Sequence, residues 1–109
     1  MSEANNIAAI VVTYNRLNLL KENIQALLMQ SFKKIDIYVI DNGSTDGTGD
    51  YIKSQHVNRL IYVNTGSNLG GAGGFSFGIK YTLSSKDYDY LWLMDDDTIP
   101  NNDALESLY

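Results

Sequence analysis

Three consecutive aspartates, Asp95, Asp96 and Asp97, follow the apolar run YLWLM at residues 90–94. Neighbouring carboxylates repel one another and are costly to remove from water, so such a cluster either faces solvent or holds a cation. Alternate side chains of an extended backbone point the same way, which would place Asp95 and Asp97 on one face and turn Asp96 aside. Two carboxylates so arranged suit Mg²⁺ or Mn²⁺, since these ions prefer oxygen ligands. An exposed acidic turn is the alternative, but a position at the end of an apolar strand favours the metal site.

The segment DNGSTDGT at residues 41–48 interleaves acidic, amide and glycine residues, as calcium loops do. Its register excludes a calcium loop, because Gly43 falls on a ligand position and Ile52 stands where the closing glutamate belongs. A tight strand-to-helix turn is the better interpretation, with Ser44 or Thr45 as the helix cap. Asp41, at the end of the preceding strand, can accept hydrogen bonds from a base or a ribose.

The segment NLGGAGGF at residues 68–75 offers backbone amides that can approach an anion closely, ahead of a predicted helix. It is not a dinucleotide fingerprint, because Gly71 and Gly73 are followed by Ser76 where the third glycine is required. The absence of a GK[ST] sequence also excludes a P-loop. A flexible loop without a ligand remains the alternative.

The segment TYNR at residues 13–16 combines an aromatic ring, backbone amides and a guanidinium group. Tyr14 is suited to stack on a base, and Arg16 is suited to pair with a phosphate. Either side chain would serve equally well to cover the end of a helix.

Four apolar, β-branched runs predict strands at residues 7–13, 35–40, 60–64 and 90–94. Residues at helical spacing predict three intervening helices: one of about three turns from Leu17, capped by Asn18; one over residues 45–54; and one with Phe75, Ile79 and Leu83 on its buried face. Strands that alternate with helices are typical of repeated βαβ units. The sequence therefore predicts an α/β fold with a Rossmann-like, doubly wound and mostly parallel sheet.

The segments described above all follow predicted strands. Because the carboxyl ends of parallel strands meet at one edge of a sheet, where ligands bind in such folds, we expect these segments to converge there. Residues far apart in the sequence would then form one site.

Composition excludes several classes of function. The 109 residues, 44% apolar and 19% charged, suit a single globular domain. Thirteen acidic and eight basic residues give a net charge of −5, which argues against a nucleic-acid partner. The chain has no cysteine and His56 is its sole histidine, so a thiolate zinc site is excluded and any metal would be a hard ion.

The two ends of the sequence give expectations about where in the cell the protein lies and about whether the sequence is a fragment. MSEANN lacks the regions of a signal peptide, and no apolar run reaches the roughly 18–20 residues that span a bilayer. We therefore expect a cytoplasmic protein, which as a full-length chain would work at the inner face of the membrane. Residues 101–109 begin a further predicted helix, capped by Asn101 or Asn102, where the sequence stops. This predicts a fragment, whose uncovered apolar surface would favour self-association.

In this order, the segments resemble the nucleotide-sugar-binding half of inverting family-two glycosyltransferases with the GT-A fold. The strand ending in TYNR, the DNGSTDGT turn and the D-x-D at residues 95–97 each fit that family's pattern, and the likeness covers nearly all of the chain. NLGGAGGF together with MDDD is similar, more narrowly, to bacterial galactofuranosyl- and rhamnosyltransferases. The resemblance implies that residues 1–109 are a single nucleotide-sugar-binding domain of a longer glycosyltransferase.

The resemblance also implies a role for residues at the first two strand ends. Thr13 and Tyr14 would line the nucleoside pocket, and Arg16 would lie near the diphosphate. Asp41 would accept a hydrogen bond from the base, typically uracil. Asp96 would belong with these donor-binding residues.

The glycine-rich segment would border the ribose, phosphates and sugar through Asn68, Gly70, Gly71 and Gly74. Many relatives carry Ala-Arg-Asn in this region, whereas residues 73–75 here are Gly-Gly-Phe. The group that reaches the diphosphate from this segment is therefore not assigned by the resemblance.

Asp95 and Asp97 would carry the divalent ion, Mn²⁺ or Mg²⁺, Asp97 most directly. The implied reaction transfers a sugar, with inversion, from a nucleoside diphosphate donor, UDP- or dTDP-linked, to a polysaccharide or glycolipid acceptor. The ion would neutralise charge that develops on the leaving diphosphate. The family's general base would lie beyond residue 109, so these residues would bind donor and metal only.

Two other functions stay open at this level. A sugar-phosphate nucleotidyltransferase also uses a Rossmann-like sheet and carboxylate-bound Mg²⁺, but usually has a basic glycine-rich loop after its first strand, where TYNRLNLL stands here. A non-catalytic module, such as a receiver-like domain, would collect carboxylates after the first strand, which here ends in Thr13.

Overall fold

The computed structural model describes residues 6–30, 35–101 and 104. The elements are, in order, β1 (Ile7–Thr13), α1 (Leu17–Leu28), β2 (Ile35–Asp41), α2 (Thr48–Ser54), β3 (Leu60–Asn64), α3 (Gly70–Ser85) and β4 (Tyr90–Asp95). Within these residues the strands form a four-stranded sheet in the order β3-β2-β1-β4, with every pairing parallel. The predicted α/β fold with a parallel sheet is confirmed. The helix predicted over residues 101–109 falls, apart from residues 101 and 104, outside the described residues.

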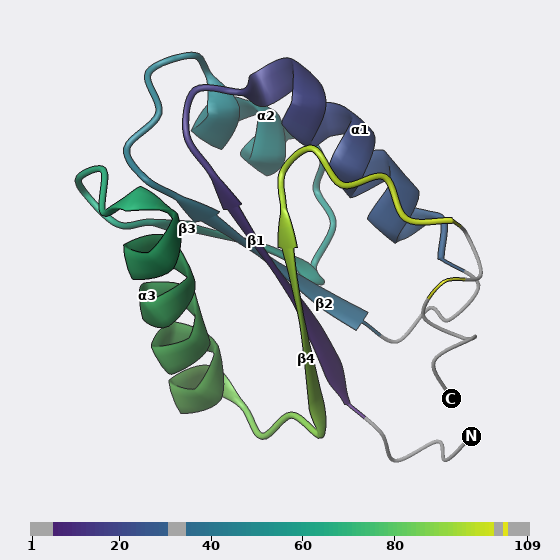
Figure 1. Cartoon of the computed structure of the whole chain (residues 1–109). Coiled ribbons are helices and arrows are strands. Elements are labelled where there is room, and N and C mark those ends of the chain that lie inside the picture. The colour runs from purple at the N-terminus through teal and green to yellow at the C-terminus, as the bar shows by residue number, and fades with distance from the viewer. Residues whose placement is uncertain (1–5, 31–34, 102–103, 105–109) are drawn as a thin grey trace.

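The two central strands are buried on both faces, which explains their continuous apolar runs. Along β1, Ile7, Ala9 and Val11 belong to the core beneath α1 and α2, whereas alternate residues such as Ala8 and Ile10 belong to the core beneath α3. Figure 1 shows α1 and α2 on one face of the sheet and α3 on the other. The sheet is thus the middle layer of three, and the site is built at one of its edges.

The third helix begins earlier than the sequence predicts. Residues 70–74, interpreted as the end of a loop, form the first turns of α3. Glycine disfavours helix, but tertiary packing overrides that preference here. Gly74, Gly78 and Thr82 lie four residues apart and are all buried against the sheet, while Leu83, predicted to face the core, is exposed. The buried face of α3 is therefore a stripe of small residues.

The small residues let α3 approach the sheet closely. A Cβ atom on Gly74 would lie 2.7 Å from Cγ1 of Val12, and one on Gly78 would lie 2.8 Å from Cγ1 of Ile40. Any side chain at either position would overlap a residue of the central strands. Close approach brings the first turn of α3 to the ends of β1 and β2.

No helix in the described ranges is long and apolar enough to cross a bilayer.

Candidate functional site

The four predicted segments converge at the carboxyl ends of the strands. An open pocket of about 330 Å³ lies there, lined by Val12, Thr13, Tyr14, Arg16, Asn42, Asn68, Gly70, Gly71, Asp95 and Asp96. These residues come from the end of β1, the end of β2, the start of α3 and the end of β4. The predicted site residues Asp41, Gly74 and Asp97 do not line this pocket. Gly74 instead lies at the contact between α3 and the sheet.

The three aspartates form a turn rather than a continuation of the strand. β4 ends at Asp95, and the amide of Thr98 donates a 3.1 Å hydrogen bond to the carbonyl of Asp95. The expected extended backbone is therefore wrong, although the predicted separation of Asp96 from Asp95 and Asp97 is confirmed in their exposure. Asp96 is the buried member, only 2% exposed, while Asp95 and Asp97 are exposed.

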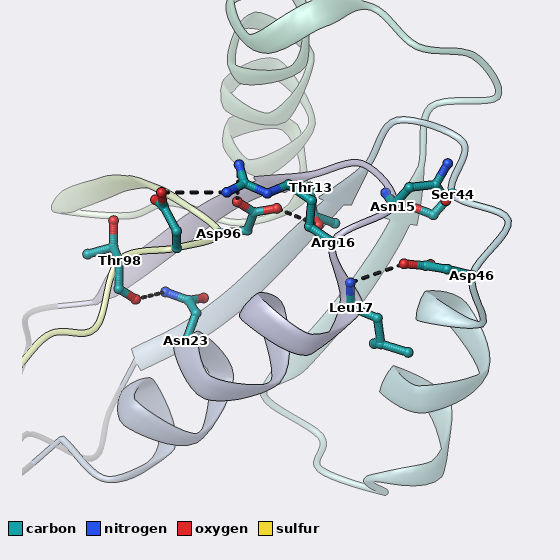
Figure 2. Close-up of polar contacts among 10 residues, drawn as sticks. Thr13, Asn15, Arg16, Leu17, Asn23, Ser44, Asp46, Asp96 and Thr98 are labelled. Carbon is teal, nitrogen blue, oxygen red and sulfur yellow. Dashed lines mark hydrogen bonds and ion pairs between the residues drawn. The ribbon is translucent and has the colours of Figure 1, made fainter.

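Asp96 is held by one side chain from the end of β1 and one from the cap of α1, as Figure 2 shows. The Thr13 hydroxyl donates to its Oδ2 at 2.9 Å, and Nη1 of Arg16 lies 3.2 Å from its Oδ1. Arg16 also reaches Asp97, with Nη2 at 3.6 Å from Oδ2. One guanidinium group therefore neutralises part of the acidic cluster.

The environment of Asp96 disfavours its charge. Burial raises the pKa of Asp96 above its usual value, and the charges of Asp97 and Asp95 act in the same direction. The hydrogen bond from Thr13 and the charge of Arg16 oppose this rise. Because a buried carboxylate that loses its partners is strongly destabilising, Thr13 and Arg16 keep the turn folded against its own repulsion.

The exposed carboxylates fit a hard divalent ion in type but not in number. Asp95 and Asp97 supply oxygen donors at the surface, which is the chemistry that Mg²⁺ and Mn²⁺ prefer. In the described part of the chain, no three His, Cys, Asp or Glu side chains come together as a metal site. An ion here would therefore need further ligands from water or from the phosphates of a bound molecule, as Mg²⁺ commonly does.

Asp41 lies beside the pocket, fully buried at the end of β2. The amide of Ser44 donates to its Oδ1 at 2.9 Å, and the Tyr62 hydroxyl donates to its Oδ2 at 2.6 Å. Burial and this hydrogen bond raise the pKa of Tyr62 to about 12. Asp41 thus anchors the turn after β2 to β3. Its carboxylate is fully buried, so the structure gives it a supporting role at the pocket and not the direct contact with a base that the sequence predicts.

Tyr62→Phe is expected to lower the free energy of unfolding by about 1–2 kcal/mol near neutral pH, because Asp41 loses a buried hydrogen bond. Tyr62 titrates near 10 when unfolded and near 12 when folded, so its contribution is complete below pH 10 and lost as the pH rises towards 12. Urea unfolding across this range should therefore show the difference between wild type and variant shrinking. Tyr81→Phe, at an exposed ring, is the control, and a difference that stays constant with pH would contradict the prediction.

Asn42 is a site residue that the sequence interpretation missed. It is 2% exposed, its Nδ2 donates to the carbonyl of Gly70 at 3.1 Å, and its Oδ1 accepts from the Thr65 hydroxyl at 3.2 Å. Gly70 adopts a left-handed φ of 75°, which only glycine accepts readily. Asn42 therefore ties the end of β2 to the start of α3. The signal was present, since an amide follows Asp41 directly, but it was interpreted only as part of a turn.

The loops after β1 and β2 are joined by hydrogen bonds, part of which Figure 2 shows. The backbone amide of Asn15 donates to the Ser44 hydroxyl at 2.8 Å, and the backbone amide of Thr45 donates to the side-chain Oδ1 of Asn15 at 2.7 Å. Asp46 completes the set by accepting from the Leu17 amide at 3.0 Å. The two loops therefore form one unit that supports Tyr14 and Arg16 between them.

Asp46 also corrects the predicted helix caps. α1 starts at Leu17 as predicted, but Asn18 lies inside its first turn and Asp46 accepts from its first amide. α2 starts at Thr48, after a left-handed Gly47, rather than at residue 45 with a Ser44 or Thr45 cap. Both of those residues are engaged by the loop after β1 instead. These caps depend on contacts between segments about 30 residues apart, which local spacing does not reveal.

Asp46→Ala is expected to cost about 0.5–2 kcal/mol of stability, as other helix-cap removals do. Burial acts to raise the pKa of Asp46, but hydrogen bonds from Thr48 and Leu17 outweigh it and hold the pKa below the usual 3.8. The stabilisation is therefore present above pH 3.8 and is lost as the pH falls through the lowered folded-state pKa. Unfolding titrations of wild type and variant should converge in acid, whereas Asp87→Ala, an exposed control, should show no such convergence.

Comparisons with known proteins agree with this arrangement. The family model described as Glycosyl transferase family 2 matches residues 8–109. Galactofuranosyltransferase GlfT1 of Mycolicibacterium smegmatis is 34% identical over 100 residues, which cover 92% of this chain and 32% of that protein. Poly-beta-1,6-N-acetyl-D-glucosamine synthase of Staphylococcus aureus is 30% identical over 105 residues, which cover 95% of this chain and 24% of that protein. This chain therefore spans about a quarter to a third of the length of these relatives.

Solved structures share the fold. S. aureus TarS 1-349 in complex with UDP-GlcNAc matches with a TM-score of 0.78 and 24% identity, over 94% of this chain and 30% of that chain. Mannosyltransferase PcManGT from Pyrobaculum calidifontis, in complex with GDP-Man and Mn²⁺, matches with a TM-score of 0.70 and 23% identity, over 86% of this chain and 28% of that chain. Because the family model covers nearly the whole sequence and the parallel sheet agrees with it, this chain belongs to glycosyl transferase family 2.

Proposed function

We propose that this chain is the donor-binding domain of a longer, inverting glycosyltransferase. The donor would be a nucleoside diphosphate sugar, UDP- or dTDP-linked, and the acceptor a polysaccharide or a glycolipid. The observation that carries the proposal is the convergence of four strand-end segments on one pocket, with exposed carboxylates and a guanidinium group at its edge. The names of the relatives, which include a galactofuranosyltransferase and a polysaccharide synthase, support the same class of reaction.

The pocket offers a distinct surface to each part of such a donor. Tyr14, exposed at the end of β1, presents a ring on which a base can stack, and Thr13 lies beside it. Gly70 and Gly71, at the start of α3, line the pocket at the end of the helix whose dipole favours a phosphate. Arg16 adds a positive charge that is able to pair with the same phosphates. Base, ribose and diphosphate would thus lie across the strand ends.

Asp95 and Asp97 would hold the divalent ion beside the diphosphate. Bound there, Mn²⁺ or Mg²⁺ would supply a positive charge that stabilises the leaving nucleoside diphosphate. Arg16 would share this task from the β1 side, because it already contacts Asp96 and Asp97. The acidic turn would then no longer repel the donor.

The acceptor site and the general base are proposed to lie outside residues 1–109. The relatives are three to four times as long as the matched region, which leaves room for both. We therefore expect these residues to bind donor without efficient sugar transfer.

Calorimetric titration of the chain with UDP tests the proposal. We expect binding in the presence of Mn²⁺, weaker binding with Mg²⁺, and a large loss when the ion is removed by a chelator. UDP that fails to bind under all three conditions would refute the donor-binding assignment.

Two further assays separate the alternatives. Release of pyrophosphate from UTP and a sugar phosphate would indicate a nucleotidyltransferase. A stable acyl phosphate formed from a small phosphodonor would indicate a receiver-like module.

A further inference from the structure

Asn23 occupies an unusual place in α1. It lies at apolar spacing with Leu20, Ile24 and Leu27, and like them it is fully buried. Its Oδ1 atom is buried without a hydrogen-bond partner. Polar groups in this condition are rare in folded proteins and call for an explanation. A leucine at this position would satisfy the core better.

The amide nitrogen of Asn23 contacts both ends of the acidic turn. Its Nδ2 donates to the carbonyl of Thr98 at 2.8 Å and to Sδ of Met94 at 3.3 Å. Met94 precedes the three aspartates, and Thr98 follows them. The two amide protons of one side chain therefore bracket residues 95–97, and Figure 2 shows the contact with Thr98.

A second side chain extends the same attachment. Gln30, also fully buried, donates from Nε2 to the carbonyl of Asn101 at 2.6 Å. Gln30 lies two residues beyond the end of α1, seven positions after Asn23. The chain after the aspartates therefore runs alongside α1, as Figure 1 shows, and is held at both ends.

The turn at residues 95–97 needs such support because its three carboxylates repel one another. The turn is closed by a hydrogen bond from the Thr98 amide to the carbonyl of Asp95. Thr98 is itself fixed by its carbonyl contact with Asn23. Loss of that contact would free the residue that closes the turn.

We propose that Asn23 is a positioning residue that holds Asp95 and Asp97 in place for the divalent ion and the nucleotide. This inference rests on the proposed function, because the ion and the nucleotide are its ligands. Asn23 touches neither, and acts through the backbone of Thr98. The buried, unpartnered Oδ1 of Asn23 then destabilises the core, and it is present because the same side chain carries the amide protons that contact Met94 and Thr98.

Asn23→Leu tests the proposal. The variant removes the buried orphan oxygen and adds apolar contact, so its melting temperature should equal or exceed that of wild type. Its dissociation constant for UDP in the presence of Mn²⁺ should nevertheless rise roughly tenfold, as for other residues that orient metal ligands. Hydrogen exchange at the Thr98 amide, followed by NMR without metal or nucleotide, should become faster.

Two controls separate positioning from general stability. Asn18→Leu makes the same replacement on the exposed side of α1 and should leave both UDP affinity and Thr98 exchange unchanged. Gly78→Ala, on the opposite face of the sheet, should lower the melting temperature but leave affinity unchanged well below it. If Asn23→Leu does not fold, the smaller Asn23→Ser replaces it in the same measurements.

Unchanged affinity and unchanged Thr98 exchange in the Asn23 variant would overturn the positioning role, while wild-type binding would leave the proposed function standing. Failure of wild type itself to bind UDP with Mn²⁺ would overturn both. The positioning role would also be overturned if Asn23→Leu and Gly78→Ala lost UDP affinity to the same extent for the same loss of stability.

Discussion

Asp97→Ala is expected to weaken Mn²⁺-dependent binding of UDP roughly a hundredfold, which corresponds to about 3 kcal/mol. Asp97 is exposed, and its ion pair with Arg16, at 3.6 Å, is made through Oδ2, so an ion would reach the carboxylate beside that pair. With few protein ligands at the site, the loss of one removes a large share of the metal affinity. Calorimetric titration with UDP at saturating Mn²⁺ gives the dissociation constants directly.

Folding should be unaffected by this substitution, since changes at exposed positions usually alter stability by no more than about 0.5 kcal/mol. Asp87→Ala is the matched control, because it removes the same charge between α3 and β4, at the opposite edge of the sheet. An Asp97→Ala chain that binds UDP and Mn²⁺ like wild type would remove this residue from the site. Equal losses in both variants would point to net charge rather than to a ligand.

Gly78→Ala is expected to destabilise the fold by about 1–3 kcal/mol, the usual range for overpacking. The added methyl group would lie 2.8 Å from Cγ1 of Ile40 and 2.9 Å from Cγ2 of Ile10. Both atoms are close to the backbone of central strands, so neither has room to give way. In a domain of this size each kcal/mol shifts the melting temperature by about 4 °C or more, which calorimetry or circular dichroism resolves.

Gly71→Ala provides the comparison on the same helix. A Cβ atom at Gly71 would meet nothing within 4 Å, and alanine favours the helical conformation over glycine. We therefore expect unchanged or slightly raised stability there. A similar loss at both positions would mean that helix propensity, and not contact with the sheet, governs the response to substitution.

The strands were predictable because their burial leaves a direct signature. Residues 7–13 and 60–64 match β1 and β3 at both ends, and the other two strands differ from their predictions by one residue. A strand covered on both faces has to be apolar throughout, and local sequence is sufficient to show this. The convergence of the site then follows from the parallel sheet alone.

Details of the site were less predictable because they depend on tertiary contacts. The buried aspartate is Asp96, selected by Thr13 and Arg16 from a distant strand end. Asn42 makes a hydrogen bond to Gly70, 28 residues later, and Asp46 accepts one from Leu17, 29 residues earlier. Asn23 differs from these residues, because an amide at an apolar position of a helix is visible in the sequence itself.

The strand order has a consequence for how the chain folds. β4 pairs with β1, and the contact between Thr13 and Asp96 joins residues 83 positions apart. Contacts of such long range close large loops and are slow to form, whereas β1, α1 and β2 assemble from nearer neighbours. The aspartates are therefore expected to arrive last, so that refolding molecules would regain the sheet's first pairings before they regain any affinity for a nucleotide.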